Sequence, residues 1–220
     1  MRVVADAPAL ARAAVELWRE AAAEAVRARG RFVAAISGGK TPLPVYALLA
    51  AEPGLPWRET ELFLADERCV PPGHPDSNLG AAREALLAHV PARAHPVAVE
   101  REPEEAARAY DAELGAAGPL DLVLLGIGAD GHTASLFPGS PALLVRDRLA
   151  VAARAPAGLP GPWRVTLTFA ALDAARRVVF LVEGAAKRAT VARALAGDDL
   201  PAAKVRAAEV LLLVTRDAAA

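Results

Sequence analysis

The pattern that most constrains the fold is the alternation of short apolar segments with longer segments of helical periodicity. Apolar runs of five or six residues are too short for helices and favour buried strands, as at 31–36, 61–65 and 120–125. Between them, segments such as 8–29 and 103–117 place apolar side chains on one helical face. Continuously apolar strands separated by helices are typical of a parallel sheet covered on both sides. The sequence therefore predicts a doubly wound α/β fold: a mostly parallel sheet with helices on both faces.

The remaining expected elements continue this order along the chain. Helices are expected after Pro42, at 78–88 and at 184–196. Further strands are expected at 95–99, 149–153, 163–169, 176–182 and 209–214, and a polar, Pro-rich loop at 66–77. The Pro- and Gly-rich stretch 155–162 is predicted to be a surface loop and not a domain boundary. Because the chain has no repeat and no low-complexity linker, we predict one domain over residues 1–220.

Composition and charge exclude several classes of protein. With 220 residues, 54% hydrophobic and 23% charged, the chain can bury a large core and is too apolar to be disordered. The formal net charge of −1 and the lack of a strongly basic stretch argue against a nucleic-acid partner. No apolar run approaches the roughly 18 residues of a membrane span, and the charged N-terminal segment is unlike a signal peptide. Since Cys69 is the single cysteine, we expect a cytoplasmic protein with no membrane partner.

The amide and lysine contents are unusually low. The chain has no glutamine, one asparagine and three lysines, and alanine and arginine are in excess. Scarcity of amides is consistent with a heat-adapted protein. A G+C-rich genome explains the alanine and arginine excess equally well, so both interpretations stay open.

Three expected strands end in loops rich in polar residues and glycine, where ligands of open α/β sheets bind. The first loop is Ser37-Gly38-Gly39-Lys40-Thr41, and a helix is expected to follow it. Paired glycines let backbone N–H groups approach a ligand, and a helix N-terminus favours phosphate. The spacing of a P-loop is missing. We predict phosphate binding here; the alternative is a tight strand-to-helix turn capped by Thr41.

The second loop carries carboxylates and an arginine. It begins with Asp66 and Arg68 and continues to Asn78. At the carboxyl end of a strand such groups can act as acid, base or substrate clamp. The alternatives are surface salt bridges and, for Ser77 or Asn78, N-capping of the next helix. Because no histidine lies near Cys69 in the sequence, we expect that thiol to be inert.

The third loop follows the most apolar strand, and its residues 126–131 formally match G-x-G-x-x-G. A dinucleotide site needs this motif to open a long helix, whereas Pro138-Gly139 interrupts the segment. Asp130 would also place a negative charge against the pyrophosphate. We predict instead a loop that presents Asp130 and His132, because a neutral imidazole can take a proton from water near neutral pH. The alternative is a loop histidine that hydrogen-bonds the backbone.

Two further basic residues complete the set of candidates. Arg164 begins an expected strand, and Lys187 follows another strand exit. Since lysine is so rare here, Lys187 is a candidate phosphate ligand; the alternative is a solvated surface lysine. No H-E-x-x-H or C-x-x-C spacing occurs, so no metal site is expected. A nucleophile elbow is excluded because Ala35 stands two residues before Ser37, where that motif has glycine.

Together these segments resemble the 6-phosphogluconolactonase family. The matching stretches, of which 125–139 is the most specific, are spread over nearly the whole chain: 37–42, 66–68, 76–78, 125–139, 164–168 and 200–205. The resemblance implies a fold similar to that of glucosamine-6-phosphate deaminases. It also implies hydrolysis of 6-phospho-D-glucono-1,5-lactone to 6-phosphogluconate, the second step of the oxidative pentose phosphate pathway, without a metal or organic cofactor.

The resemblance further implies roles for individual residues. The loop 37–41, Arg164 and Lys187 would hold the phosphate. His132 would activate the attacking water and Asp130 would help to orient it. The lactone end would be lined by Arg68 and Asn78, with Asp66 among the binding residues. We expect a monomer or small homo-oligomer whose partner is this small sugar-phosphate lactone.

Two rival functions remain open at this point. A glucosamine-6-phosphate deaminase or sugar-phosphate isomerase would share the fold and the phosphate loop. In the deaminases, however, tyrosine commonly follows the Asp-Glu pair, where this chain has Arg68. A sugar-phosphate-sensing regulatory domain is the other rival, and it would be expected to carry an attached DNA-binding module.

Overall fold

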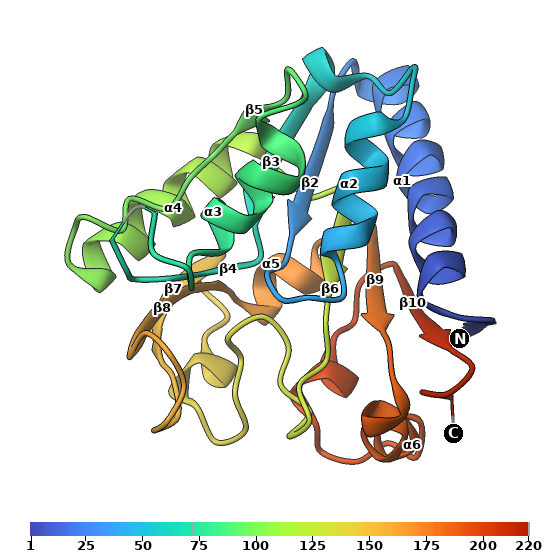
Figure 1. The fold of residues 1–220 in the computed structure, drawn as a ribbon. Helices are drawn as coiled ribbons and strands as arrows, with labels where there is room; N and C mark the ends of the chain where they lie inside the picture. The colour runs from blue at the N-terminus through green and yellow to red at the C-terminus, as the bar shows by residue number, and fades with distance from the viewer. Residues whose placement is uncertain (72, 220) are drawn as a thin grey trace.

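The computed structural model describes residues 1–71 and 73–219, which form two β-sheets (Figure 1). The main sheet has seven strands in the order β1-β10-β9-β6-β2-β3-β5, and all its neighbouring strands are parallel. These strands are β1 (Arg2–Val4), β2 (Phe32–Ile36), β3 (Thr60–Leu64), β5 (Arg93–Ala94), β6 (Leu122–Leu125), β9 (Arg177–Val182) and β10 (Glu209–Thr215).

Helices cover both faces of this sheet, as predicted. One face packs against α1 (Ala7–Arg29), α2 (Leu43–Ala51), α3 (Asn78–Ala82) and the π-helical turn that continues it (Arg83–Leu87). The other face packs against α4 (Pro103–Ala117) and α5 (Phe169–Asp173). Helix α6 (Arg188–Leu195) lies beyond the carboxyl end of β9, toward which the strand arrows point (Figure 1). The doubly wound fold is thereby confirmed.

Local sequence explains the longest helix, α1. The Asp6 carboxylate accepts a hydrogen bond from the Ala9 N–H at 2.9 Å and caps the first turn. Gly30, at a φ of 72°, ends the helix in the left-handed conformation that favours glycine. On the buried face, the Trp18 ring meets Phe32 of β2 edge to face, with ring centroids 5.2 Å apart. The helix therefore packs directly onto the strand that leads to the first candidate loop.

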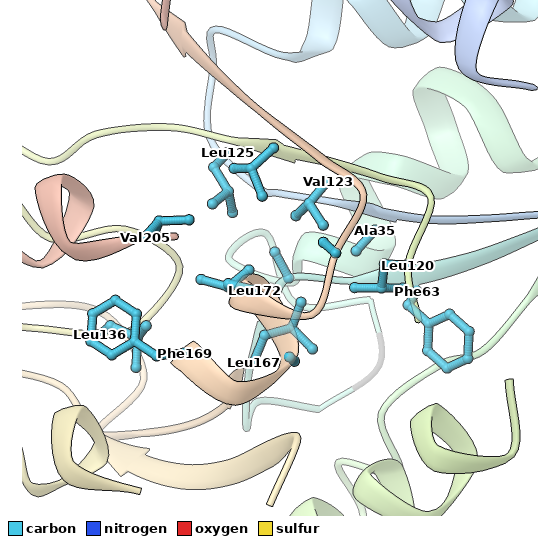
Figure 2. Packing of buried hydrophobic residues seen from close by; sticks show 14 of the residues in the cluster. Ala35, Phe63, Leu120, Val123, Leu125, Leu136, Leu167, Phe169, Leu172 and Val205 are labelled. Atoms are coloured by element: carbon cyan, nitrogen blue, oxygen red, sulfur yellow. The ribbon is translucent and has the colours of Figure 1, made fainter. Parts of the chain in front are cut away.

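The core is divided into two layers by the sheet. Successive residues of a strand face opposite sides, so Ala35 and Val123 enter one layer while Leu124 enters the other. Figure 2 shows the first layer, where Leu172 of α5 packs against these sheet residues. Complete burial of the central strands explains why their sequences show no polar alternation.

A second sheet differs from the expectation for the segment after β3. Asp66–Arg68 was predicted to belong to a loop, but it forms strand β4 in an antiparallel sheet with β8 (Trp163–Leu167) and β7 (Ala150–Arg154). The prediction of a loop was wrong because polar side chains do not prevent extended backbone when a neighbouring strand supplies the hydrogen bonds. This pairing places Arg68 opposite Arg164.

Smaller differences occur at the sheet edges. Strand β1 was not predicted, because three residues carry too little periodicity to be recognised. The strand expected at 95–99 was wrong in position: β5 ends at Ala94. Beyond β5, the Tyr110 hydroxyl from α4 bonds both the N–H and the C=O of Leu64, at 2.6 and 2.9 Å, and so completes the exposed edge of β3. The segment 155–162 is a surface loop between β7 and β8, as predicted.

Among the described residues, no helix is both long and apolar enough to span a membrane.

Candidate active site

A pocket of about 420 Å³ lies at the carboxyl ends of the parallel strands. Loops from β2, β6 and β9 meet there with β4 and with the loop between β7 and β8. The structure brings to this pocket every candidate site residue except Asp130: Ser37, Gly38, Gly39, Lys40, Thr41, Asp66, Arg68, Asn78, His132, Arg164 and Lys187. Asp130 lies against the His132 side chain. Segments far apart in sequence thus converge on one cavity.

The loop 37–41 joins β2 to α2 with its backbone open to the pocket. The buried hydroxyl of Tyr46 donates a hydrogen bond of 2.7 Å to the Ser37 carbonyl and holds the start of the loop. Gly39 has a φ of 98°, which a residue with a side chain adopts only under strain. The alternative in which Thr41 caps the helix is wrong, because Pro42 occupies the N-cap and no side chain caps it. The first turn of α2 offers little to an anion, because the Leu43 N–H bonds the Lys40 carbonyl at 3.3 Å and Pro44 has no N–H, so the backbone that faces the pocket is that of loop 37–41.

Gly38 makes room for a buried amide. Asn78 is 3% exposed, and its Nδ2 donates to the Asp66 carbonyl at 2.7 Å and to the Asp66 Oδ1 at 3.2 Å. A methyl group on Gly38 would overlap the Asn78 amide. The close approach of loop 37–41 to Asn78 therefore requires glycine at position 38.

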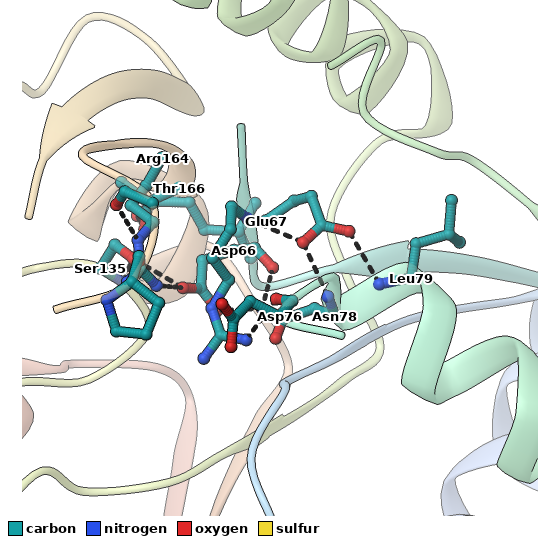
Figure 3. Close-up of polar contacts among 12 residues, drawn as sticks. Asp66, Glu67, Asp76, Asn78, Leu79, Ser135, Arg164 and Thr166 are labelled. Atoms are coloured by element: carbon teal, nitrogen blue, oxygen red, sulfur yellow. Dashed lines mark hydrogen bonds and ion pairs between the residues drawn. The ribbon is translucent and has the colours of Figure 1, made fainter. Parts of the chain in front are cut away.

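The buried side chain of Asp66 contacts several polar residues of this region (Figure 3). Its Oδ2 accepts a hydrogen bond of 2.6 Å from the Ser135 hydroxyl, and it lies 3.9 Å from Nη1 of Arg164. Because Asp66 is only 7% exposed, the alternative of a surface salt bridge is wrong. With Asn78 on its other oxygen, Asp66 fixes two pocket residues and balances the charge of Arg164.

Arg164 is held by the loop before it. Its Nη2 donates to the Pro160 carbonyl at 2.6 Å and its Nε to the Gly161 carbonyl at 3.3 Å. Burial lowers the pKa of this guanidinium and the charge of Asp66 opposes that effect, so the group stays cationic. Arg68, across the strand pair, donates from Nη1 to the Asp76 carbonyl at 2.6 Å. The second sheet thus sets two guanidinium groups beside the pocket.

Glu67 has a structural role that the sequence did not predict. Its carboxylate accepts from the N–H groups of Asn78 and Leu79 at 2.8 and 2.7 Å, which places it at the N-terminus of α3. Ser77 caps the same helix: its hydroxyl accepts from the Gly80 N–H at 3.0 Å, which confirms the capping alternative for Ser77. Burial raises the pKa of Glu67, although these hydrogen bonds oppose the rise. Glu67 therefore anchors the helix that carries Asn78.

His132 and Asp130 form a hydrogen-bonded pair. Nδ1 of His132 lies 2.5 Å from Oδ1 of Asp130, which also accepts the His132 backbone N–H at 3.1 Å. Burial raises the pKa of Asp130, but these hydrogen bonds and the charge of His132 outweigh it and hold that pKa below its usual range. An ionised carboxylate can only accept, so Nδ1 carries the proton and the Nε2 lone pair is free. The alternative of a histidine bonded to backbone is wrong for this ring.

Gly128 lies against this pair. Its N–H donates to the His132 carbonyl at 2.8 Å, which closes the loop. A methyl group on Gly128 would overlap the imidazole and approach the Asp130 carboxylate to 2.6 Å. The Phe137 ring supports the imidazole from another side, with centroids 4.7 Å apart. Glycine at 128 and the aromatic ring together fix the direction of the imidazole.

We expect Gly128→Ala to reduce kcat by about ten- to a hundredfold, because the imidazole must move and misplacement of about an ångström has effects of this size. The measurement is steady-state hydrolysis of the lactone that the sequence resemblance implies, together with a thermal melt. Gly115→Ala is the control, because in α4 the same methyl group has no atom within 4 Å. An unchanged kcat for Gly128→Ala would show that the orientation of His132 is not limiting.

The structure also shows the surroundings of two other candidate residues, Lys187 and Cys69. Lys187 is half-buried and lines the pocket at the N-terminus of α6, the position expected of a phosphate ligand. Burial, together with the charge of Glu67, raises the pKa of the Cys69 thiol to about 11. Cys69 is therefore protonated at neutral pH and unsuited to act as a nucleophile.

The residues that the structure describes contain no group of three or more His, Cys, Asp or Glu side chains arranged for a metal ion.

Sequence reasoning missed several pocket residues. Phe137 lies within the third motif, yet its contact with the imidazole depends on the turn of the loop. Leu159 and Pro160 line the pocket from the loop between β7 and β8, and Glu183 lines it at the end of β9. Only the position of Glu183 directly after an apolar strand offered a signal in the sequence.

The fold and the pocket define an α/β protein with a pocket at the carboxyl edge of a parallel sheet, lined by the cationic side chains of Lys40, Arg68, Arg164 and Lys187. Residues 5–213 match the family of glucosamine-6-phosphate isomerases and 6-phosphogluconolactonases, and the chain belongs to this family. It is 39% identical over 214 residues to the 6-phosphogluconolactonase of Nostoc sp., covering 91% of this chain and 87% of that protein. The identity to the 6-phosphogluconolactonase of Pseudomonas putida is 38% over 212 residues, covering 93% and 86%. The resemblance predicted from sequence is confirmed.

Solved structures agree with this assignment. The crystal structure of the Thermotoga maritima 6-phosphogluconolactonase matches with a TM-score of 0.89 and 32% identity, covering 98% of each chain. A monomeric glucosamine-6-phosphate deaminase matches with a TM-score of 0.86 and covers 99% and 98%, but at 20% identity. The latter likeness shows the shared fold alone, which was also predicted.

Proposed function

We infer that this chain hydrolyses 6-phospho-D-glucono-1,5-lactone to 6-phospho-D-gluconate, the second step of the oxidative pentose phosphate pathway. Family membership and the names of relatives that span most of its length support this function. The observation that carries it is that His132, held by Asp130, shares one pocket with Arg164, Lys187 and the loop 37–41. A base and an anion-binding region, held at a fixed separation, suit a lactone that carries a remote phosphate.

The reaction needs a base and charge stabilisation. Nε2 of His132 removes a proton from water as the water oxygen bonds to the lactone carbonyl carbon. Asp130 stabilises the imidazolium that forms. When the tetrahedral intermediate collapses, the bond to the ring oxygen breaks, and the imidazolium returns the proton to that oxygen. A δ-lactone is a reactive ester, so base-activated water suffices without a covalent nucleophile, and general-base catalysis contributes about 10²–10⁴-fold.

Binding is divided between two parts of the pocket. We assign the phosphate to Lys187, Arg164 and the backbone of loop 37–41, where cations and free N–H groups combine. We assign Arg68 and Asn78, which also line the pocket, to the lactone, where a guanidinium would stabilise the developing oxyanion. Asp66 acts through Asn78 and Arg164. Phosphate binding at one end thus orients the carbonyl at the other.

The deaminase rival is less well supported. The shared fold does not discriminate, but Arg68, which lines the pocket, stands where the resemblance implies tyrosine for a deaminase. The relatives from Nostoc sp. and Pseudomonas putida are both named 6-phosphogluconolactonase, which supports the lactonase function. Release of ammonia from glucosamine 6-phosphate is the measurement that favours the rival, and binding of 6-phosphogluconate without turnover of the lactone would indicate a sensing domain.

The decisive experiment is lactone hydrolysis followed by pH-stat, corrected for the spontaneous rate. We expect strong acceleration with the 6-phosphorylated lactone and no ammonia from glucosamine 6-phosphate. Cys69→Ser is the control that should retain activity, because the thiol is protonated and outside the proposed chemistry. A rate equal to the spontaneous rate with a fully folded protein would contradict the proposed function.

We further propose that residues 1–220 act as one domain, as a monomer or small homo-oligomer in the cytoplasm. The proposed reaction requires no metal or organic cofactor, since the imidazole supplies the base. Neither a nucleic acid nor a membrane is proposed as a partner.

A further inference from the structure

A partly buried hydrogen bond joins helix α6 to the loop that carries Asp130 and His132. The Thr190 hydroxyl donates to the Ala129 carbonyl at 3.0 Å, and Thr190 is 4% exposed. Ala129 immediately precedes Asp130, so this bond fixes the plane of the peptide unit that leads into Asp130. On the other side of the loop, the Ala202 N–H bonds the Gly131 carbonyl at 3.0 Å. Thr190 therefore holds the part of the loop nearest to the Asp130 carboxylate.

The same helix begins at a residue of the phosphate-binding region. Lys187 is the N-cap of α6 and lines the pocket, and Thr190 follows three residues later. Side chains three residues apart lie on one side of a helix, about one turn apart. The first turn of α6 therefore connects Lys187 to Thr190, and Thr190 connects to the Asp130 loop.

The other ties of helix α6 to the rest of the fold are largely exposed: Arg188 donates from Nε and Nη2 to the Asp217 carbonyl at 3.2 and 3.0 Å at the protein surface. Of its eight residues, Thr190 and Val191 are buried. It is preceded by Gly184, at a φ of 92°, and by a short turn in which Ala185 and Ala186 are exposed. A helix with so little buried surface can settle against a ligand at its first turn. A change in the position of the helix then moves Thr190 and Val191 and the residues that they contact.

We propose that Thr190 is a positioning residue that couples phosphate binding at Lys187 to the orientation of the Asp130–His132 pair. This inference rests on the proposed function. An anion bound by Lys187 fixes the first turn of α6, and the Thr190 hydroxyl then fixes the Ala129 carbonyl and the direction of Asp130. Because Asp130 holds Nδ1 of His132, the direction of Nε2 follows. Binding energy from the remote phosphate is thereby used to orient the base.

The test separates the two parts of the substrate. Unphosphorylated glucono-1,5-lactone is hydrolysed with and without inorganic phosphite, which occupies the phosphate region. We expect phosphite to raise kcat/KM about tenfold or more in the unsubstituted protein. Thr190→Val, which keeps the shape and removes the hydroxyl, should lose most of this activation while phosphite affinity changes less than about threefold. Thr190→Ser should retain the activation, because it keeps the donor.

Thr60→Val is the matched control. Thr60 is 1% exposed and its hydroxyl also donates to a backbone carbonyl, that of Pro56 at 2.7 Å, at the amino end of β3. Loss of stability alone would affect this variant in the same way as Thr190→Val, but it should keep full activation. Equal activation in Thr190→Val and the unsubstituted protein would overturn the coupling. So would a lack of activation in the unsubstituted protein.

Hydrogen exchange gives a readout that is independent of hydrolysis. We expect saturating inorganic phosphate to slow amide exchange in residues 126–132 of the unsubstituted protein and of Thr190→Ser, but not of Thr190→Val. If the 6-phosphorylated lactone is not hydrolysed while this pattern holds, the proposed function fails and the coupling stands. If hydrolysis is fast and exchange in 126–132 does not respond to phosphate, the coupling fails and the function stands.

Discussion

Replacement of His132 by asparagine is expected to lower kcat by about two to four orders of magnitude, the usual contribution of a general base. Asparagine preserves much of the size and some hydrogen bonding but has no group that takes a proton near neutral pH. Affinity for 6-phosphogluconate should stay nearly intact, because we assign the phosphate to residues other than His132. The measurements are steady-state hydrolysis by pH-stat and calorimetric titration of the product.

Two controls accompany this variant. Ser135→Ala removes a hydroxyl from the same motif and its hydrogen bond to Asp66, and we expect most of the activity to be retained because Ser135 is completely buried and is no nucleophile. Mass spectrometry during turnover should show no acyl-enzyme. Near-normal turnover in His132→Asn, or a trapped acyl-enzyme, would contradict the base mechanism. Neither result would change the assignment of the substrate.

The pH profile follows from the same pair. The rate should fall at acidic pH, because protonation of His132 removes the Nε2 lone pair. Asp130 does not account for this fall: its pKa is held below the usual range, so its carboxylate stays ionised throughout the weakly acidic region. A carboxylate with a lowered pKa supports the folded loop at higher pH and loses that effect only as pH falls through its own titration. The acidic limb should disappear in His132→Asn.

Replacement of Lys187 by alanine is expected to weaken 6-phosphogluconate binding by about tenfold or more. A charge-assisted hydrogen bond contributes about 1.5–3 kcal/mol, and about 1.4 kcal/mol corresponds to tenfold in affinity. KM for the phosphorylated lactone should rise in parallel. Calorimetric titration with the product at two salt concentrations measures the effect, since loss of a cation also reduces the salt dependence.

Lys204→Ala provides the matched control, because it removes another of the three lysines at a site where Nζ pairs with Asp199 at 2.6 Å. This pair lies outside the pocket, so product affinity should not change. Unchanged affinity in Lys187→Ala would remove Lys187 from the phosphate site while leaving His132 as the base.

The sequence by itself determined the central strands of the main sheet and the loops that contain the candidate site residues. Buried strands such as Leu122–Leu125 are uniformly apolar and α1 carries its own cap at Asp6, so both are encoded by neighbouring residues. The rule that ligands bind beyond the carboxyl ends of parallel strands then indicated the loops that start at Ser37 and Gly126. Both kinds of information are local in the chain and can be recognised without coordinates.

Only the tertiary structure decided how the candidates act on one another. Asp66 bonds Ser135, 69 residues away, and the pairing of β4 with β8 sets Arg68 opposite Arg164. The contact between Thr190 and Ala129 likewise spans 61 residues. Such contacts depend on strand order, register and helix placement, which result from the packing of the whole core. A polar side chain has the same local pattern whether it contacts a ligand, caps a helix or holds another residue, and the neighbours that distinguish these roles come from distant parts of the chain.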